Sequence, residues 1–279
     1  MKYLLFNPLA GAGEAKSDAE GYSVLSAERC RLVDMTEISN YKEFLEILED
    51  GDEVYIFGGD GSINRFINGI GETQLTNNIY YFPSGTHNNF ALDIKNRTKP
   101  VLINHQIKRL PYAFINGKKY MFVSGINIGL DNCCLELEKE QKKEGQVKNY
   151  YSNAFKAVFS AFKPFGVTLS VDNRRTHIKK VWISDITFGT HCGSGMIPAP
   201  RQKRGSSDRK VSLSLLHSTG KLKTLMVLPS VFKGKHLKYK KNVTVLSGNR
   251  IDLDFEKEIS VRIDGEVIDR VKDISVTVR

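Results

Sequence analysis

The stretch Asp52–Ile70, DEVYIFGGDGSINRFINGI, decides the fold of this chain. It begins with an apolar run of β-branched and aromatic residues, Val54–Phe57, which is typical of a buried strand. A glycine-rich turn ends the run, and apolar residues then recur at helical spacing from Ile63 to Ile70. The sequence therefore predicts a strand, a tight turn and a helix in this order.

The turn between this strand and this helix has the chemistry of a phosphate site. It consists of Gly58, Gly59, Asp60, Gly61 and Ser62. A strand that feeds a helix through such a turn aims backbone N–H groups at one point, and glycines let an anion approach because they carry no Cβ. Asp60 is a hard-oxygen partner for the Mg²⁺ that accompanies a nucleotide, directly or through water. The alternative is a plain turn in which Asp60 caps the helix.

Turns of a similar kind follow the other strands predicted in the first hundred residues. Strands are expected at Lys2–Phe6, Arg31–Met35 and Asn78–Phe82, and helices at Ser17–Glu28 and Asn40–Asp50. Alternating strands and helices predict a parallel sheet flanked by helices, with its ligand at the carboxyl ends of the strands. We assign residues 1–110 to an α/β nucleotide-binding domain of this kind.

The pattern changes beyond Pro100. Asn116-Gly117 is a strong hairpin signal, and helices are expected at 132–143 and 149–162. Short alternating strands follow from Phe165 onward, among them Ile251–Phe255 and Ile259–Ile263. Repeated strands of this length predict an antiparallel β-sandwich, to which we assign residues 111–279.

Composition limits the partners and the compartment. The net charge of +10 favours anionic partners, but no helix-turn-helix, zinc-finger or aromatic-basic pattern supports nucleic acid. No apolar run is long enough to span a bilayer, and the N-terminus lacks the apolar stretch of a signal peptide. The four cysteines have no metal-type or disulfide-type spacing, which is typical of a reduced cytoplasmic protein.

Five motifs together resemble those of the diacylglycerol kinase, sphingosine kinase and bacterial lipid kinase superfamily. They are N-P-x-[AS]-G at 7–11, G-G-D-G-S with the helix after it at 58–70, G-T-x-N-x-F-A at 85–91, G-L-D at 129–131 and D-G-E at 264–266. The G-G-D-G core is shared with NAD kinases and phosphofructokinases. The resemblance implies a nucleotide-binding domain of that type and a second, β-sandwich domain that closes the active-site cleft.

The resemblance also implies a reaction, namely transfer of the γ-phosphate of ATP to a lipid hydroxyl with Mg²⁺. Asp264 is then the general base, with Glu266 orienting it or serving in its place. Thr36 either contacts the nucleotide or caps the following helix. The implied cofactor-binding residues are Asn7, Thr36, Gly58, Gly59, Asp60, Gly61, Ser62, Gly85 and Thr86.

Three departures from the family pattern affect the expected chemistry. Arg65 replaces the usual Glu, and it could contact phosphate. Asn89 replaces an Asp and so lacks the charge that helps to bind Mg²⁺. Asp208 alone remains of an acidic turn, so a second metal site is expected to be weak or absent. A weakly active or non-catalytic regulator that binds nucleotide or lipid, and a kinase for a soluble acceptor, are the alternatives.

Two further segments bear on the substrate. Lys221–Lys241 mixes seven lysines with apolar residues, which indicates a basic amphipathic helix on an anionic membrane, or else a solvated lysine face. We therefore expect a cytoplasmic protein, peripherally bound at the inner face of the cell membrane. Asp131 either positions substrate or caps the next helix, and capping is favoured. The acceptor lipid and the oligomeric state, including a homodimer, stay open.

Overall fold

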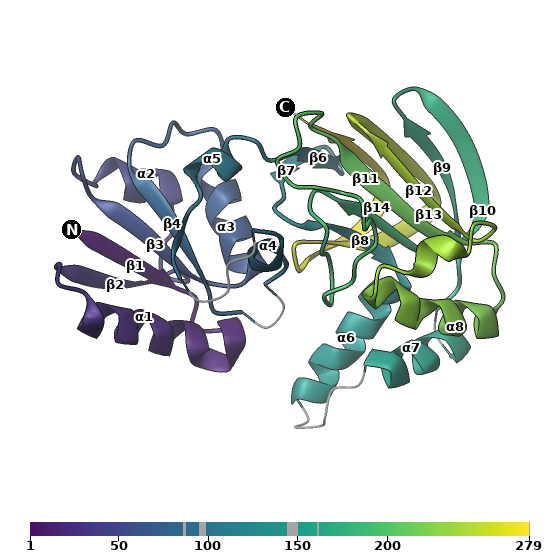
Figure 1. The fold of residues 1–279 in the computed structure, drawn as a ribbon, viewed down its shortest axis with the longest axis horizontal. Helices are drawn as coiled ribbons and strands as arrows, with labels where there is room; N and C mark the ends of the chain where they lie inside the picture. Colours follow the sequence, from purple (N-terminus) through teal and green to yellow (C-terminus); the bar gives the residue numbers. More distant parts are fainter. Residues whose placement is uncertain (86–87, 95–98, 144–149, 161, 279) are drawn as a thin grey trace. The chain divides into compact units, whose positions relative to one another are not determined.

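The computed structural model describes residues 1–85, 88–94, 99–143, 150–160 and 162–278. The chain divides into two compact units, Met1–Leu110 and Pro111–Arg279 (Figure 1). The first unit is built around a mostly parallel sheet with helices, and the second is rich in antiparallel strands. The fold class predicted from the sequence is therefore confirmed.

The N-terminal unit contains a five-stranded sheet with the order β2-β1-β3-β4-β5. Four strands are parallel, and only the short β5 runs antiparallel to its neighbour. The central strands are the most deeply buried, as their apolar sequences require. The strands are β1 (Lys2–Phe6), β2 (Cys30–Asp34), β3 (Glu53–Gly58), β4 (Asn78–Pro83) and β5 (Val101–Leu102). Because β1, β3 and β4 are parallel neighbours, the loops that follow them meet at one edge of the sheet.

Helices cover both faces of this sheet. Figure 1 shows α1 on one face and α2 and α3 on the other. Leu4 and Phe6 point to the α1 side, where they share a core with Ala15 and Ala19. The helices are α1 (Glu14–Leu25), α2 (Tyr41–Glu46), α3 (Asp60–Ile70), α4 (Asn89–Asp93) and α5 (Asn104–Ile107), with a 3-10 turn at Ala10–Gly13.

Two helices differ from the prediction. The helix expected over Asn40–Asp50 ends at Glu46. The Asp52 carboxylate accepts the Glu49 N–H at 3.0 Å and pairs with the N-terminal amine at 2.6 Å, which turns the chain before the helix can continue. The first helix begins at Glu14 and ends at Leu25, because Ser26 adopts extended backbone.

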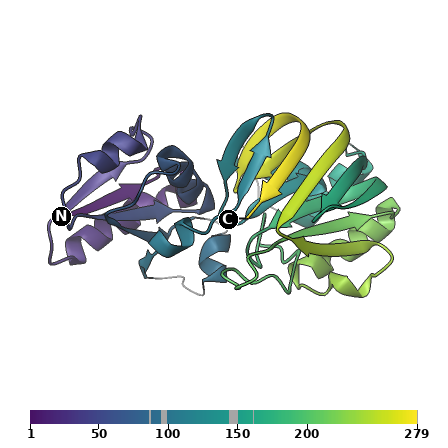
Figure 2. The same ribbon diagram turned by 90° about the horizontal axis from the view of Figure 1, so that it is seen from above.

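Among the described residues, the C-terminal unit contains nine strands, and every strand pair is antiparallel. Two short strands, β8 and β9, each pair with both long strands β10 and β13, so the strands form one hydrogen-bonded network. Figure 2 shows the β13–β14 hairpin beside β6 and β7. The strands are β6 (Tyr112–Ile115), β7 (Lys118–Met121), β8 (Gly125–Gly129), β9 (Phe165–Val171), β10 (Arg174–Thr187), β11 (Val211–His217), β12 (Val243–Gly248), β13 (Arg250–Ile263) and β14 (Glu266–Thr277).

Strand β13 corrects the prediction of two separate strands, 251–255 and 259–263. It is a single strand whose register against β14 shifts between Asp254 and Ile259. The shift marks a β-bulge, which bends the strand without ending it. The polar residues between the two apolar runs therefore mark a bulge and not a loop.

Three helices pack along one side of these strands (Figure 1): α6 (Leu130–Lys143), α7 (Tyr150–Phe159) and α8 (Lys221–Phe232). Their buried residues form a core around Trp182, Leu130, Val158 and Val227. The basic helix expected to reach Lys241 ends at Phe232, two residues before Gly234, whose φ is +62°. Within the described residues, no helix is both long and apolar enough to cross a membrane.

Candidate active site

The loop after β3 is packed so closely that it requires glycine. A Cβ on Gly58 would collide with the side chain of Ser62, which is buried at the start of α3. A Cβ on Gly59 would lie 3.3 Å from the Cα of Gly85, in the loop after β4. In turn, a Cβ on Gly85 would collide with the backbone of Gly59. The two glycine loops that the sequence singled out therefore lie against each other.

Asn7 ties the loop after β1 to this pair. Its Nδ2 donates to Ser62 Oγ at 3.1 Å, and its Oδ1 accepts the N–H of Leu9 at 3.0 Å. Gly11, with a φ of +59°, lies so near the Ser84 carbonyl that a Cβ there would clash with it. Three loops from three neighbouring strands thus form one unit, and these loops carry the predicted residues Asn7, Gly58, Gly59, Asp60, Gly61, Ser62 and Gly85.

Asp60 links the central loop to the start of α4. Its Oδ2 accepts the backbone N–H of Asn89 at 2.9 Å, and its Oδ1 accepts that of Phe90 at 3.0 Å. Asn88, in the left-handed region with a φ of +41°, holds the turn before α4: its Oδ1 accepts from Gly85 N–H at 3.0 Å, and its Nδ2 donates to the Gly85 carbonyl at 2.6 Å. Asp60 therefore caps a helix, but α4 and not its own helix α3.

Magnesium is the cofactor to test against this geometry. The described residues contain no group of three or more His, Cys, Asp or Glu side chains that could hold a metal by themselves. Mg²⁺ usually keeps several waters and binds one or two carboxylates plus substrate phosphates, so it needs no such cage. A single oriented carboxylate at Asp60 fits that mode, whereas Asn89 is buried and contributes an amide in place of a charge.

Three other predicted residues have distinct surroundings or are not described. Thr36 is exposed, and its N–H and hydroxyl both donate to Asp34 Oδ1 at 2.7 Å. The cap of α2 is Asn40, so the capping role considered for Thr36 is wrong. Thr86 lies outside the described residues. Asp208 is exposed and lies 3.7 Å from Lys210 Nζ.

Asp264, in the C-terminal unit, accepts three backbone hydrogen bonds. Its Oδ2 accepts from Val123 N–H at 2.5 Å, and its Oδ1 accepts from Ser124 and Gly125 N–H at 2.8 and 2.9 Å. The residue is buried, with a φ of +45°. These bonds fasten the D-G-E turn to the beginning of β8.

Glu266, two residues later, is exposed at the start of β14. The turn before it receives a second support, because Arg262 Nη1 donates to the Gly265 carbonyl at 3.3 Å. Arg262 is itself buried, and burial lowers the pKa of its guanidinium. The D-G-E turn therefore presents one fixed carboxylate and one exposed carboxylate.

A row of buried polar residues that the sequence analysis missed crosses the strands beside this turn. Asp185 on β10, Asn127 on β8 and Arg262 on β13 are direct cross-strand neighbours, so their side chains share a face. Asn127 Nδ2 donates to Asp185 Oδ1 at 2.9 Å, and burial raises the pKa of Asp185. The signal was present in the sequence, as a charged residue inside the apolar run Val181–Ile186.

Asp131 completes this polar cluster from the first turn of α6. It is fully buried, and its Oδ1 accepts from the Tyr150 hydroxyl at 2.8 Å, so the favoured capping role is not what the structure shows. Burial raises the pKa of Asp131 to about 6. Asp131 Oδ2 and the Nε and Nη2 atoms of Arg262 have no hydrogen-bond partner among the described residues.

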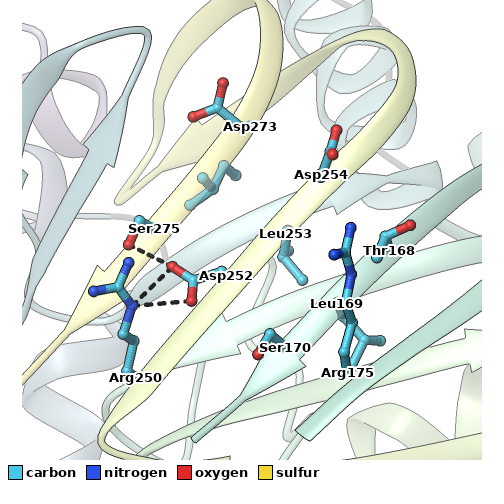
Figure 3. Close-up of a pocket in the computed structure, with 11 residues that line it drawn as sticks. Thr168, Leu169, Ser170, Arg175, Arg250, Asp252, Leu253, Asp254, Asp273 and Ser275 are labelled. Carbon is cyan, nitrogen blue, oxygen red and sulfur yellow. Dashed lines mark hydrogen bonds and ion pairs between the residues drawn. The ribbon is translucent and has the colours of Figure 1, made fainter. Parts of the chain in front are cut away.

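A groove of about 590 Å³ lies elsewhere, on strands β9, β10, β13 and β14 (Figure 3). Its charges largely neutralise one another, because Arg250 Nε pairs with Asp252 at 2.9 Å and Ser275 donates to the same carboxylate. None of the predicted site residues lines it. We therefore do not assign the groove to the active site.

Comparison with known proteins gives a family match for each of the two units. Residues 2–111 match the diacylglycerol kinase catalytic domain family, and residues 124–278 match the YegS C-terminal NAD kinase beta sandwich-like domain. A diacylglycerol kinase from Mycobacterium tuberculosis is 23% identical over 249 residues, which cover 84% of this chain and 78% of that protein.

Solved structures show the same fold. The crystal structure of a diacylglycerol kinase from Bacillus anthracis superposes with a TM-score of 0.66 at 20% identity, covering 99% of this chain and 93% of that one. A yeast NADH kinase complexed with NADH gives a TM-score of 0.54 at 9% identity, covering 100% of this chain and 78% of that one. With both of its units matched, the chain belongs to the diacylglycerol kinase catalytic domain family, as a YegS-like bacterial lipid kinase homologue.

Proposed function

We propose that this protein transfers the γ-phosphoryl group of ATP to a hydroxyl group of a lipid. The proposal rests on the contacts that join the loops after β1, β3 and β4. Asn7 bonds Ser62, and Gly59 lies against Gly85. Phosphoryl transfer asks mainly for positioning and for neutralisation of charge, and fixed glycine loops supply the first. Membership of a lipid kinase family indicates the class of acceptor.

The nucleotide is assigned to the N-terminal unit. Backbone at Gly58–Ser62 would face the phosphates, since it leads into the N-terminus of α3, which favours an anion, and Gly85 lies against it. Asn7 and Thr36, at the ends of β1 and β2, are assigned to the nucleoside. Mg²⁺ neutralises phosphate charge when it enters with ATP, and Asp60 would hold it through water.

The proton of the acceptor hydroxyl is assigned to Glu266. In the reaction the hydroxyl oxygen forms a bond to the γ-phosphorus, the bond from phosphorus to ADP breaks, and the hydroxyl proton passes to a carboxylate. Protonation of Asp264 would weaken the three hydrogen bonds that it accepts from backbone N–H groups, because hydrogen bonds to an ionised carboxylate are stronger than those to a neutral one. The exposed Glu266 has no such cost, so Asp264 serves as the positioning residue, which reverses the roles first expected of the two.

Because the proposed acceptor is a lipid, the protein would act as a peripheral membrane protein at the inner face of the cell membrane, where ATP is available. Diacylglycerol, a sphingoid base, phosphatidylglycerol and a polyprenol are the acceptor classes to be separated. The test is transfer of ³²P from labelled ATP, with Mg²⁺, to a lipid extract in anionic vesicles.

One labelled lipid that disappears with Glu266→Gln would support the proposal and name the acceptor. No labelled lipid, despite ATP binding that Asp60→Ala abolishes, would identify a nucleotide-binding regulator. Label in a water-soluble product would identify a kinase for a soluble acceptor. Arg65, which is exposed on α3, and Asn89 are the residues that favour a weakened enzyme.

A further inference from the structure

Helices α7 and α8 expose an unusual set of large apolar side chains. Tyr151, Phe155 and Phe159 follow one another at intervals of four along α7, and Leu222 and Met226 do so along α8. Their exposed fractions lie between 44% and 72%. We call these five residues the α7–α8 surface. Their spacing places each row on one side of its helix, opposite the side that is buried in the core.

The two rows lie side by side. The ring of Tyr151, near the start of α7, is 5.9 Å from that of Phe232 at the end of α8. At the other end, Lys221 Nζ lies 5.3 Å from the ring centroid of Phe159. The helices are therefore antiparallel, and Figure 1 shows them next to each other. The rings of Phe155 and Phe159 lie 4.8 Å apart, so the α7 row is continuous.

The charged side chains in the two chain segments that carry this surface are all cationic. Residues 150–163 and 217–242 contain nine lysines and no aspartate or glutamate. Lys156, Lys221 and Lys223 stand exposed on the two helices themselves. Exposed acidic side chains lie on the neighbouring helix α6, at Glu136 and Glu140. An apolar surface that carries cations beside its apolar side chains fits a partner whose anionic groups lie in front of a hydrocarbon layer.

An anionic lipid bilayer has this chemistry, and a second copy of the chain does not. In a two-fold dimer the same patch would face itself, so the lysines of one copy would oppose those of the other. On a bilayer, aromatic rings enter the boundary between headgroups and acyl chains while lysines reach the phosphates. Lys221 Nζ lies above the ring of Phe159, so this pair offers one cation and one aromatic ring at the same place on the surface.

We propose that the α7–α8 surface is the site by which this protein docks on an anionic bilayer. Phe155, Phe159, Leu222 and Met226 enter the interface, and Lys156, Lys221 and Lys223 contact lipid phosphates. The inference rests on the proposed function in one respect, since a lipid acceptor supplies the reason for docking. The lysine-rich segment 233–241, which lies beyond the end of α8, is not required.

The test is co-sedimentation of the full chain with vesicles of phosphatidylglycerol and phosphatidylcholine, and with phosphatidylcholine alone. The wild-type protein should bind the anionic vesicles and release with added salt. Phe155→Ser with Phe159→Ser should lower binding to both. Lys221→Glu with Lys223→Glu should lower binding to the anionic vesicles at least about tenfold, since each cation near the surface contributes about fivefold.

A matched control uses Val24→Ser with Leu25→Ser on α1, two residues that are 84% and 88% exposed in the other unit. This variant should bind like the wild type. As a second readout, Phe155→Trp should shift its emission to the blue on vesicles, while the single natural tryptophan, Trp182, is already buried. Equal vesicle binding by wild type and both α7–α8 variants would overturn the proposal.

The wild type could fail to bind vesicles and instead form a concentration-dependent dimer that Phe155→Ser with Phe159→Ser abolishes. That result would show that a second copy of the chain covers the surface. The readout is separate from catalysis. Binding that depends on the surface, without phosphate transfer to any lipid, would uphold docking and reject the kinase. Phosphate transfer to a lipid that does not depend on these residues would uphold the kinase and reject docking by this surface.

Discussion

The carboxylate of Asp60, at the end of the loop after β3, accepts the backbone N–H of Asn89 at 2.9 Å, at the start of α4 after β4. The bond joins two of the five motifs that carry the family resemblance, although 29 residues separate its two partners in sequence. Asp60 thus has a structural role in addition to the one proposed for it with Mg²⁺. A substitution there has to be designed so that the two roles separate.

Asp60→Ala should release the start of α4. It leaves the N–H groups of Asn89 and Phe90 without this acceptor, at a cost of about 1–3 kcal/mol. Hydrogen–deuterium exchange of residues 88–94 should therefore rise. Asp60→Asn keeps an oxygen acceptor and loses the charge, so exchange should stay nearer that of the wild type while the affinity for ATP with Mg²⁺ falls. Unchanged exchange in Asp60→Ala would argue against the two bonds.

Glu266→Gln should lower kcat by about 10² or more, because general-base catalysis typically contributes that much. The KM for ATP and the stability should stay the same, since the Glu266 side chain is exposed. Glu258→Gln, an exposed carboxylate on β13, is the matched control and should behave as the wild type. A full rate in Glu266→Gln would exclude this residue as the proton acceptor.

Substitution of Asp264 should lower stability, whereas substitution of Glu266 should lower only the catalytic rate. Asp264→Ala removes the acceptor of three backbone N–H groups and should destabilise the C-terminal unit by at least about 2 kcal/mol. Trp182 fluorescence during denaturant unfolding reports on this unit, because that side chain is buried in its core. If Asp264→Asn were inactive and as stable as the wild type, Asp264 and not Glu266 would be the base.

The sequence predicted the glycine loops well because their chemistry is local. Gly58 is required by the side chain of Ser62, only four residues later, and the strand before it is plainly buried. The contacts between loops could not be predicted, because they depend on which strands are neighbours. Asn7 reaches Ser62 only because β1 pairs with β3 in a register that aligns Phe6 with Phe57.

The buried polar row escaped prediction for a different reason. Alternation along a strand tells which residues share a face, but not whether that face is covered. Asp185 is about 1% exposed, and Asp131 on α6 and Tyr150 on α7 lie close to it, which only the tertiary structure reveals. Capping at Asp131 was favoured from its place before a helix, and the Tyr150 hydroxyl bonds it instead.

Asp131 should make the C-terminal unit less stable as the pH rises. Burial raises its pKa from an ordinary 3.8 to about 6, so the folded state binds the proton more tightly than the unfolded state. Stability is then fully present below about pH 4 and is lost through pH 6, by roughly 3 kcal/mol at 1.4 kcal/mol per pH unit. Asp185 shifts in the same direction.

The measurement is denaturant unfolding of wild type and Asp131→Asn at pH 4.5 and 7.5, followed by Trp182 fluorescence. The amide keeps an oxygen for the Tyr150 hydroxyl, so the variant should gain stability relative to the wild type at pH 7.5 and little at pH 4.5. The same difference at both pH values would mean that Asp131 does not titrate in this range.

Asn89→Asp should show whether the missing carboxylate limits the enzyme. Asn89 is buried, and its backbone N–H bonds Asp60, so a new charge there lies near an existing one. Without Mg²⁺ the two like charges should destabilise the N-terminal unit, and Mg²⁺ should restore its stability because a cation offsets both. Turnover should then rise at fixed Mg²⁺ and depend more steeply on its concentration. Asn78→Asp, exposed at the opposite end of β4, adds the same charge and should change neither quantity. A stability response to Mg²⁺ without turnover in either form would assign the protein to nucleotide binding and not to catalysis.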